Sequence, residues 1–289
     1  MSKNIDYFKP GNLDEALDFL DENGQDTIII AGGTDVMVDL RSGELKARYI
    51  LDISRLDELK GIRLEGEKLV VGAGVTLAEI YDSDILARHA PALKKSAMNF
   101  ASAQIRNVAT IGGNVAHCSP CGDTIPPLVI HETEVVFSGK NRERRIPIEE
   151  VATGPYRCFI AKNEILTSFI LNPRSADFAD FQKIGRRKDL AISRLSMAAM
   201  VNKDADGRIS FMRLSLGACT PTPHRMTAVE EFMSDKKPTT ELLFSAGNLL
   251  AEKMIEITGR RSSIIYKEPA VQGLFVRMLY PVVQNERTL

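Results

Sequence analysis

The sequence has no tryptophan and no excess of charge of either sign. Its 289 residues include 37 Lys and Arg against 38 Asp and Glu, which leaves a net charge of −1. Such a chain has no general attraction to nucleic acid or to anionic lipid. It contains only four cysteines, too few at this length for the disulfide framework of a secreted protein. The composition therefore argues against nucleic-acid-binding and disulfide-stapled classes.

Long apolar runs are also missing. No segment approaches the roughly 20 apolar residues that a membrane span requires, and the first 20 residues lack the apolar core of a signal peptide. We therefore expect a cytoplasmic protein. The hydrophobic fraction of 44% is nevertheless sufficient to build a sizeable core. A chain of this length predicts two or three domains.

The two commonest nucleotide-binding fingerprints are absent. Gly72 and Gly74 begin a glycine-rich pattern, but Leu77 stands where a Rossmann fingerprint needs its third glycine. No Gly-Lys-Ser or Gly-Lys-Thr occurs, so a P-loop is excluded as well. A nucleotide site in this chain therefore has to be of another type.

The pattern of apolar residues predicts an α+β protein in three segments. Residues 13–20 have helical spacing between β-branched strands at 27–30 and 49–53, which predicts a small β-α-β unit over 1–57. Short strands, one of them at 129–130, alternate with helices over 58–175. After a polar linker, a hairpin at 196–203 and 209–217 precedes helices at 241–257 and 273–279, in a last segment over 176–289.

Two glycine pairs are the most informative feature. Gly32 and Gly33 follow the strand at 27–30 after a single residue, Ala31, and a second pair lies within Thr110-Ile111-Gly112-Gly113-Asn114. Glycine allows a tight turn and a close approach of backbone N–H donors to an anion. Two such loops facing each other could bind a pyrophosphate, although each alone is also compatible with an ordinary turn.

Four motifs in the same order resemble a known family. They are IIIAGGTDVMVDLR, RNVATIGGNVAHCSPCGDTIPPL, FQKIGRRKDLA and LSLGACTPTPHR. Together they resemble the FAD-binding medium subunit of molybdenum hydroxylases of the xanthine dehydrogenase, carbon monoxide dehydrogenase and aldehyde oxidoreductase type. The resemblance covers nearly the whole chain.

The resemblance implies a fold. Segments 1–57 and 58–175 would form a two-part FAD-binding domain of the vanillyl-alcohol-oxidase (PCMH) type. Segment 176–289 would form a smaller α+β C-terminal domain, with a three-stranded sheet plus helices.

The same resemblance implies where FAD binds. The first loop would contribute Ile29, Ala31, Gly32, Gly33, Thr34 and Asp35. The second would contribute Ala109, Thr110, Gly113 and Asn114, and the two together would hold the diphosphate and the ribityl chain.

Six further residues are implied at the cofactor. These are a stacking ring and its neighbour, an apolar wall, two polar contacts and a cation beside the isoalloxazine: Phe100, Ala101, Ile165, Ser119, Asp123 and Lys183. A cation there would favour the anionic reduced flavin. Without the family pattern, Phe100 would be interpreted as core, Asp123 as a cap and Lys183 as part of a solvated basic turn.

The implied function is electron transfer by a subunit of a multi-subunit molybdenum hydroxylase. Electrons would come from the iron–sulfur clusters of a 2Fe-2S small subunit, beside a large subunit with the molybdenum cofactor, and would pass to NAD(P)+ or another acceptor. No catalytic acid or base is expected, because FAD performs the redox step. The alternatives are a self-contained FAD-dependent oxidoreductase with its own substrate, and a non-catalytic nucleotide-binding module.

The cysteines depart from the family pattern. Cys118 and Cys121 form a C-x-x-C, a spacing typical of metal or iron–sulfur ligation or of a redox pair. No long insertion and no fourth ligand are evident even when Cys158 is counted, so we expect free thiols. The four histidines show no zinc spacing, and no metal site is predicted.

Overall fold

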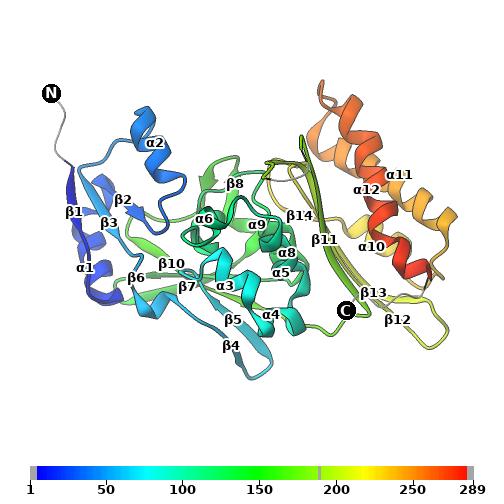
Figure 1. Ribbon diagram of the computed structural model, residues 1–289, viewed down its shortest axis with the longest axis horizontal. Helices are drawn as coiled ribbons and strands as arrows, with labels where there is room; N and C mark the ends of the chain where they lie inside the picture. The colour runs from blue at the N-terminus through cyan, green and yellow to red at the C-terminus, as the bar shows by residue number, and fades with distance from the viewer. Residues whose placement is uncertain (1–4, 188–189, 285–289) are drawn as a thin grey trace.

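The computed structural model describes residues 5–187 and 190–284. Three sheets, each covered by helices, follow one another along an elongated molecule, with β1 at one end and α10–α12 at the other (Figure 1). A further pair of short strands, β8 and β9, lies near the middle. The predicted α+β class is confirmed. None of the helices in these two ranges combines the length and the hydropathy needed to cross a membrane.

The first sheet is parallel and has the order β1–β3–β2. Helix α1 begins after Asn12, whose side chain accepts a hydrogen bond from the backbone N–H of Glu15, and it buries Ala16, Leu17 and Leu20. Because the three strands are parallel, their carboxyl ends lie along the same side of the sheet, and the chain leaves β2 on that side. The elements are β1 (Asp6–Phe8), α1 (Leu13–Asn23), η1 (Gly24–Asp26), β2 (Thr27–Ile30), α2 (Val36–Ser42) and β3 (Tyr49–Asp52).

The middle sheet is antiparallel, with the order β4–β5–β10–β6–β7. Its strands are β4 (Ile62–Glu65), β5 (Lys68–Gly72), β6 (Glu134–Gly139), β7 (Arg142–Pro147) and β10 (Glu164–Leu171), with β8 (Ala152–Gly154) and β9 (Arg157–Cys158) as a separate pair. Its helices are η2 (Asp57–Leu59), α3 (Leu77–Asp82), α4 (Asp84–His89), α5 (Pro91–Met98), α6 (Ala103–Arg106), α7 (Ile111–Ala116), α8 (Ile125–Ile130) and α9 (Ile148–Val151).

The strand predicted at 129–130 is wrong. Val129 and Ile130 form the last turn of α8, which begins at Ile125 with prolines in its first turn. Proline is tolerated at that position because the first N–H groups of a helix have no intrahelical partner. All six residues of α8 are buried, so the segment carries no amphipathic pattern from which a helix could be recognised.

The C-terminal region contains the predicted hairpin but one strand more than predicted. The expected three-stranded sheet is wrong: the sheet has four strands, because His224 and Arg225 pair with β13. Two residues that directly follow Pro223 leave too short a pattern to reveal a strand. The elements are β11 (Phe178–Gly185), β12 (Ser193–Lys203), β13 (Ile209–Gly217), β14 (His224–Arg225), α10 (Thr227–Met233), α11 (Thr240–Thr258) and α12 (Ile264–Gln284).

The C-terminal sheet is buried on both faces. One face packs against α10–α12 around Phe275 and Leu214 (Figure 1). On the other, Phe181 and Met200 meet Ala92 and Ile130 of the middle region. The two regions therefore share a continuous apolar contact.

Ion pairs reinforce this contact at Arg225 in β14. Its guanidinium donates to Glu132 of the middle region at 2.7 Å and to the buried Glu230 at 2.6 Å. Its backbone N–H also donates to the carboxylate of Glu149 at 2.8 Å. Glu230 accepts in addition from the backbone N–H of Leu214. Arg225 thus connects β14 to the middle region through Glu132 and Glu149, and to the following helix through Glu230.

We expect Arg225→Met to lower the free energy of unfolding by about 3 kcal/mol, because it leaves the buried Glu230 carboxylate without its principal partner. The control is Arg63→Met, which removes an exposed pair with Glu65 and should cost less than about 1 kcal/mol. Urea unfolding measures both. Equal losses in the two variants would contradict this assignment.

Candidate functional site

The first glycine loop leaves the end of β2 and leads into α2. Gly33 has a φ of +70°, a backbone conformation that favours glycine. Within the described part of the chain, the backbone N–H groups of residues 32–35 donate to no protein acceptor. Successive unpaired N–H donors in a turn are a feature from which proteins build anion sites.

The second glycine pair lies in a helix and not in a loop, so the prediction of a loop at 110–114 is wrong. The hydroxyl of Thr110 accepts from the N–H of Gly113 at 3.0 Å, and its carbonyl accepts from Asn114. This cap places both glycines in the first turn of α7. Gly112 packs directly on Ala73, whose carbonyl oxygen would lie 2.6 Å from an added Cβ.

Gly32 brings the two segments into direct contact. A Cβ at Gly32 would lie 1.9 Å from the carbonyl oxygen of Val108, so only glycine permits this approach. On the other side of the first loop, the carboxylate of Asp35 lies 3.9 Å from His117, just after α7. The structure therefore places the predicted residues 31–35 beside 109–114.

Replacing Gly32 by alanine should force the two backbones apart. We expect Gly32→Ala to lower the free energy of unfolding by about 2–3 kcal/mol. Gly273→Ala is the matched control, since Gly273 lies inside α12 with no atom near an added Cβ, and it should be neutral or stabilising by up to about 1 kcal/mol. Chemical denaturation of both variants measures their unfolding free energies. A Gly32→Ala variant as stable as the unchanged protein would refute the close contact.

The predicted apolar residues lie in two places, beside the first sheet and between α5 and α6. Ile165 of β10 is buried in the core that covers the first sheet, and Ile29 and Ala31 pack against that core. Phe100 and Ala101 lie between α5 and α6, where the guanidinium of Arg106 donates to both of their carbonyl oxygens. Phe100 also packs on the core of the middle region while staying partly exposed.

The predicted polar residues Asn114 and Ser119 each have a partner within their own segment. The side-chain oxygen of Asn114 accepts from the hydroxyl of Thr124 at 2.7 Å. The hydroxyl of Ser119 accepts from the backbone N–H of Cys121 at 3.3 Å. Both side chains are therefore positioned by the turn between α7 and α8.

Asp123 and Lys183 were predicted as separate cofactor contacts, but they form an ion pair with each other. The ammonium of Lys183 in β11 lies 2.7 Å from the Asp123 carboxylate and 3.2 Å from the carbonyl of Ala191. The hydroxyl of Ser193 donates to the other Asp123 oxygen at 2.5 Å. Burial raises the pKa of Asp123, and the charge of Lys183 offsets only part of that rise. The pair joins the C-terminal sheet to the turn after α7.

Breaking this pair from either side should be costly, because each change leaves an isolated charge in a buried site. We expect Lys183→Met and Asp123→Asn each to lose about 3 kcal/mol of unfolding free energy. The double variant should lose little more than either single one, since no isolated charge remains. A double-mutant cycle by urea unfolding measures the coupling. Strictly additive losses would show that the two groups act independently.

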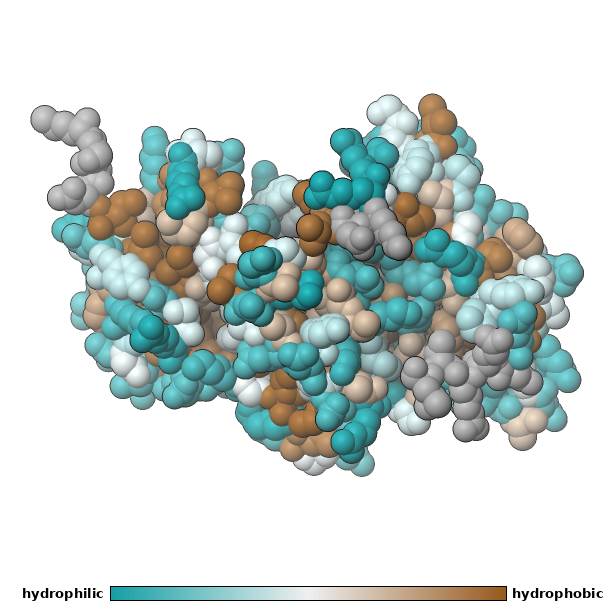
Figure 2. Space-filling view, viewed as in Figure 1, coloured by the Kyte–Doolittle hydropathy of each residue, from teal (hydrophilic) through white to brown (hydrophobic). Residues whose placement is uncertain are grey.

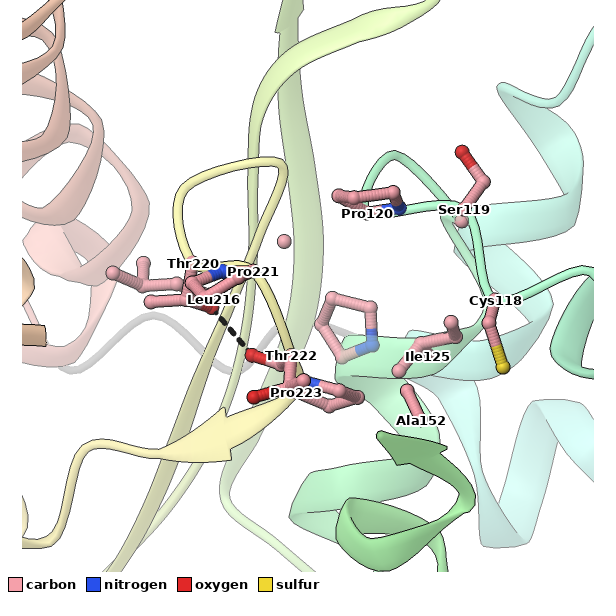
Figure 3. A pocket seen from close by; sticks show the side chains of 13 residues that line it. Cys118, Ser119, Pro120, Ile125, Ala152, Leu216, Thr220, Pro221, Thr222 and Pro223 are labelled. Carbon is pink, nitrogen blue, oxygen red and sulfur yellow. Dashed lines mark hydrogen bonds between the residues drawn. The ribbon is translucent and has the colours of Figure 1, made fainter. Parts of the chain in front are cut away.

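A narrow pocket lies between the turn after α7 and the loop from β13 to β14. Its cavity volume is only about 20 Å³, room for little more than a water molecule, and it is open in part to solvent. Figure 3 shows Cys118, Ser119 and Pro120 on one side, with Thr222 and Pro223 on the other. The motif containing Thr220–Pro223 therefore faces the motif containing Ser119.

Figure 2 shows mostly hydrophilic side chains with small hydrophobic patches on the face seen in Figure 1.

The cysteines do not gather around one point. All four are free, with Cys118 and Cys219 buried. Over residues 5–187 and 190–284, no group of three or more His, Cys, Asp or Glu side chains is placed to hold a metal ion.

Three residues that contact the predicted site residues were themselves not predicted. His117 approaches Asp35, Thr124 holds Asn114, and Ser193 holds Asp123. His117 and Thr124 lie within the second motif, and this position in the sequence could have identified them as residues near the site. Nothing local distinguishes Ser193, because its role depends on the contact between two distant segments.

Comparison with known proteins decides the family. Residues 3–174 match the FAD-binding domain in molybdopterin dehydrogenase, and residues 180–282 match the C-terminal domain of the CO dehydrogenase flavoprotein. The chain belongs to the FAD-binding medium subunits of the molybdenum hydroxylase family. It is thus an oxidoreductase subunit with an FAD-binding domain, and the resemblance found in the sequence is confirmed.

Individual relatives match over most of their length. The putative xanthine dehydrogenase FAD-binding subunit of Escherichia coli K12 is 32% identical over 260 residues, 89% of this chain and 87% of that subunit. The nicotinate dehydrogenase FAD-subunit of Eubacterium barkeri is 29% identical, covering 98% of this chain and 97% of its own. A carbon monoxide dehydrogenase structure from Hydrogenophaga pseudoflava superposes with a TM-score of 0.89 at 26% identity, over 98% of both chains.

Proposed function

We propose that FAD lies across the junction between residues 31–35 and 109–114, with its diphosphate at the first loop. The observation that carries this proposal is the row of free N–H donors at residues 32–35, set against the second segment by the close approach at Gly32. These donors fit the phosphate oxygens of a dinucleotide, because they are adjacent, unpaired and not covered by a side chain at Gly32 or Gly33. The hydroxyl of Thr34 extends the row.

The second segment would hold the ribityl chain. Ala109 and Thr110 fix the start of α7, while Gly113 is exposed and has only the Thr110 hydroxyl near an added Cβ. The Asn114 amide is held by Thr124, which leaves its NH₂ group free to donate. We assign Ser119 to the same polar side of the cofactor, because the turn after α7 carries both residues.

The apolar residues would enclose the flavin ring. Ile29 and Ile165 supply an aliphatic wall, and the partly exposed Phe100 with Ala101 supplies a ring and a small neighbour on the segment before α6. Bound FAD supplies the exchange between one-electron and two-electron transfer. The protein's part is therefore to bind, to orient and to exclude water, and we assign no acid or base.

Lys183 would act on the cofactor from the ion pair with Asp123. Two hydrogen bonds fix its ammonium at the boundary with the C-terminal sheet. A fixed cation near the ring favours negative charge on the reduced form. Asp123 thereby becomes a positioning residue for Lys183 in addition to its predicted polar contact.

We further propose the partners and the domain limits. The relatives matched over nearly their whole length are named as subunits, which supports assembly with a molybdenum-cofactor large subunit and a 2Fe-2S small subunit. Electrons would arrive from the small subunit and leave to NAD(P)+ or another acceptor in the cytoplasm. The proposed limits remain 1–57, 58–175 and 176–289.

The purified protein tests the proposal directly. We expect a yellow protein with an absorbance maximum near about 450 nm, which releases one FAD per chain on denaturation. Purification at low salt should retain two further chains. A colourless protein that takes up no FAD would refute the site, whereas FAD binding by a single chain that oxidises its own substrate would favour the self-contained enzyme.

A double variant tests the residues at the junction. Asp35→Ala with Gly113→Trp should weaken FAD binding at least tenfold, because an indole then stands over the second segment and the loop loses its contact with His117. Asp206→Ala with Gly273→Trp changes the same residue types at exposed positions and should leave the affinity unchanged. Flavin fluorescence titration measures both. Equal affinities would remove FAD from this junction.

A further inference from the structure

The C-x-x-C spacing suggests that Cys118 pairs with Cys121, but Cys118 lies against a different cysteine. Its thiol is 3.2 Å from the carbonyl oxygen of Val115 and 4.0 Å from that of Val151. Cys158 in β9 is paired with Ala152, the residue after Val151, and the N–H of Phe159 donates to the same Val151 carbonyl at 2.7 Å. The end of α9 thus brings Cys118 and Cys158 together.

The backbone holds this arrangement in place. The N–H of Tyr156, in the turn between β8 and β9, donates to the Cys118 carbonyl at 2.9 Å. Cys118 itself has a φ of +50°, a left-handed backbone conformation just after the end of α7. Both sulfurs also belong to the apolar core of the middle region, Cys118 in its interior and Cys158 at its margin.

The two thiols differ in reactivity. The hydrogen bond between them raises the pKa of Cys118 and lowers the pKa of Cys158, and the positive charge of Arg144 lowers the latter further. Arg144 is fixed beside Cys158 by Glu164 at 2.8 Å and by the carbonyl of Phe159 at 2.7 Å. Cys158 is partly exposed and Cys118 is buried. Cys158 is therefore the thiol that meets an oxidant first, with Cys118 behind it.

The other two cysteines lack these features. Burial and the charge of Asp123 raise the pKa of Cys121. Burial raises the pKa of Cys219 to about 12. Both therefore stay protonated near neutral pH and are poor nucleophiles.

We propose that Cys118 and Cys158 are a modification site, at which a hydroperoxide converts the two thiols into a reversible disulfide. The Cys158 thiolate attacks the terminal peroxide oxygen, the O–O bond breaks, and the leaving oxygen takes up a proton to give water or an alcohol. The Cys118 sulfur then attacks the Cys158 sulfenic acid, the S–O bond breaks, and water leaves with the Cys118 proton. The two thiols lose two electrons and the peroxide gains them.

The bond would close a loop of about forty residues that contains the turn after α7, the segment with Ser119 and Asp123. Oxidation should therefore raise the thermal unfolding midpoint of the chain by several degrees. Dithiothreitol should reverse the shift. The inference does not depend on FAD binding, because it uses only contacts within the chain.

The experiment uses the reduced full-length chain and hydrogen peroxide. After treatment, free thiols are blocked with N-ethylmaleimide under denaturing conditions. Mass spectrometry then measures the intact mass of the chain and identifies its linked peptides. We expect two of the four thiols to escape blocking, and one linked peptide pair that joins Cys118 to Cys158. Dithiothreitol should restore four blocked thiols.

Matched variants identify the partners. Cys121→Ser should form the bond as the unchanged protein does, and its linked peptide can contain only Cys118 on that side. Cys158→Ser should keep its three remaining thiols, whereas Cys118→Ser should form no disulfide and leave Cys158 as a sulfenic acid. A Cys118–Cys121 or Cys121–Cys219 bond, or four blocked thiols after peroxide, would overturn the proposal. The peptide map of the unchanged protein distinguishes these outcomes even where a variant fails to fold.

Discussion

The candidate site depends on the contact between the backbone at Gly32 and the carbonyl of Val108. Two segments about 75 residues apart in sequence approach until no Cβ fits between them. The contact fixes the row of N–H donors at residues 32–35 relative to the cap of α7. A glycine is needed at Gly33 for its left-handed conformation and at Gly32 for space, so the two neighbouring glycines serve different physical purposes.

The boundary with the C-terminal region is built from charges as well as from apolar packing. Lys183 in β11 forms a buried pair with Asp123, while Arg225 in β14 donates to the exposed Glu132 with its guanidinium and to Glu149 with its backbone N–H. Buried ion pairs cost desolvation and contribute little net stability, but they tolerate no mismatch in register. We infer that they fix the orientation of the C-terminal sheet over the turn after α7. In the proposed function, this orientation would place Lys183 beside the flavin.

The cysteines show why spacing alone does not identify a reactive pair. Cys118 and Cys121 are neighbours in a familiar pattern, yet the thiol of Cys118 lies near the end of α9 and interacts with Cys158. The partner, Cys158, lies 40 positions further along the chain. A spacing rule describes residues that are close in sequence, so it contains no information about the fold that brings Cys158 back to Cys118.

The sequence alone determined the family, the α+β class and the cofactor, and it predicted the segments now proposed to hold FAD, because motifs at glycines, caps and turns are local and keep their order. It also predicted α1, β2, β3 and the β12–β13 hairpin from periodicity. Periodicity failed at α8, which is buried all round, and at β14, which has only two residues. Only the tertiary structure decided that Asp123 binds Lys183, that His117 meets Asp35 and that Cys118 faces Cys158. Each of these pairs joins segments whose distance in space is set by the packing of whole sheets, a quantity that no local pattern of residues encodes.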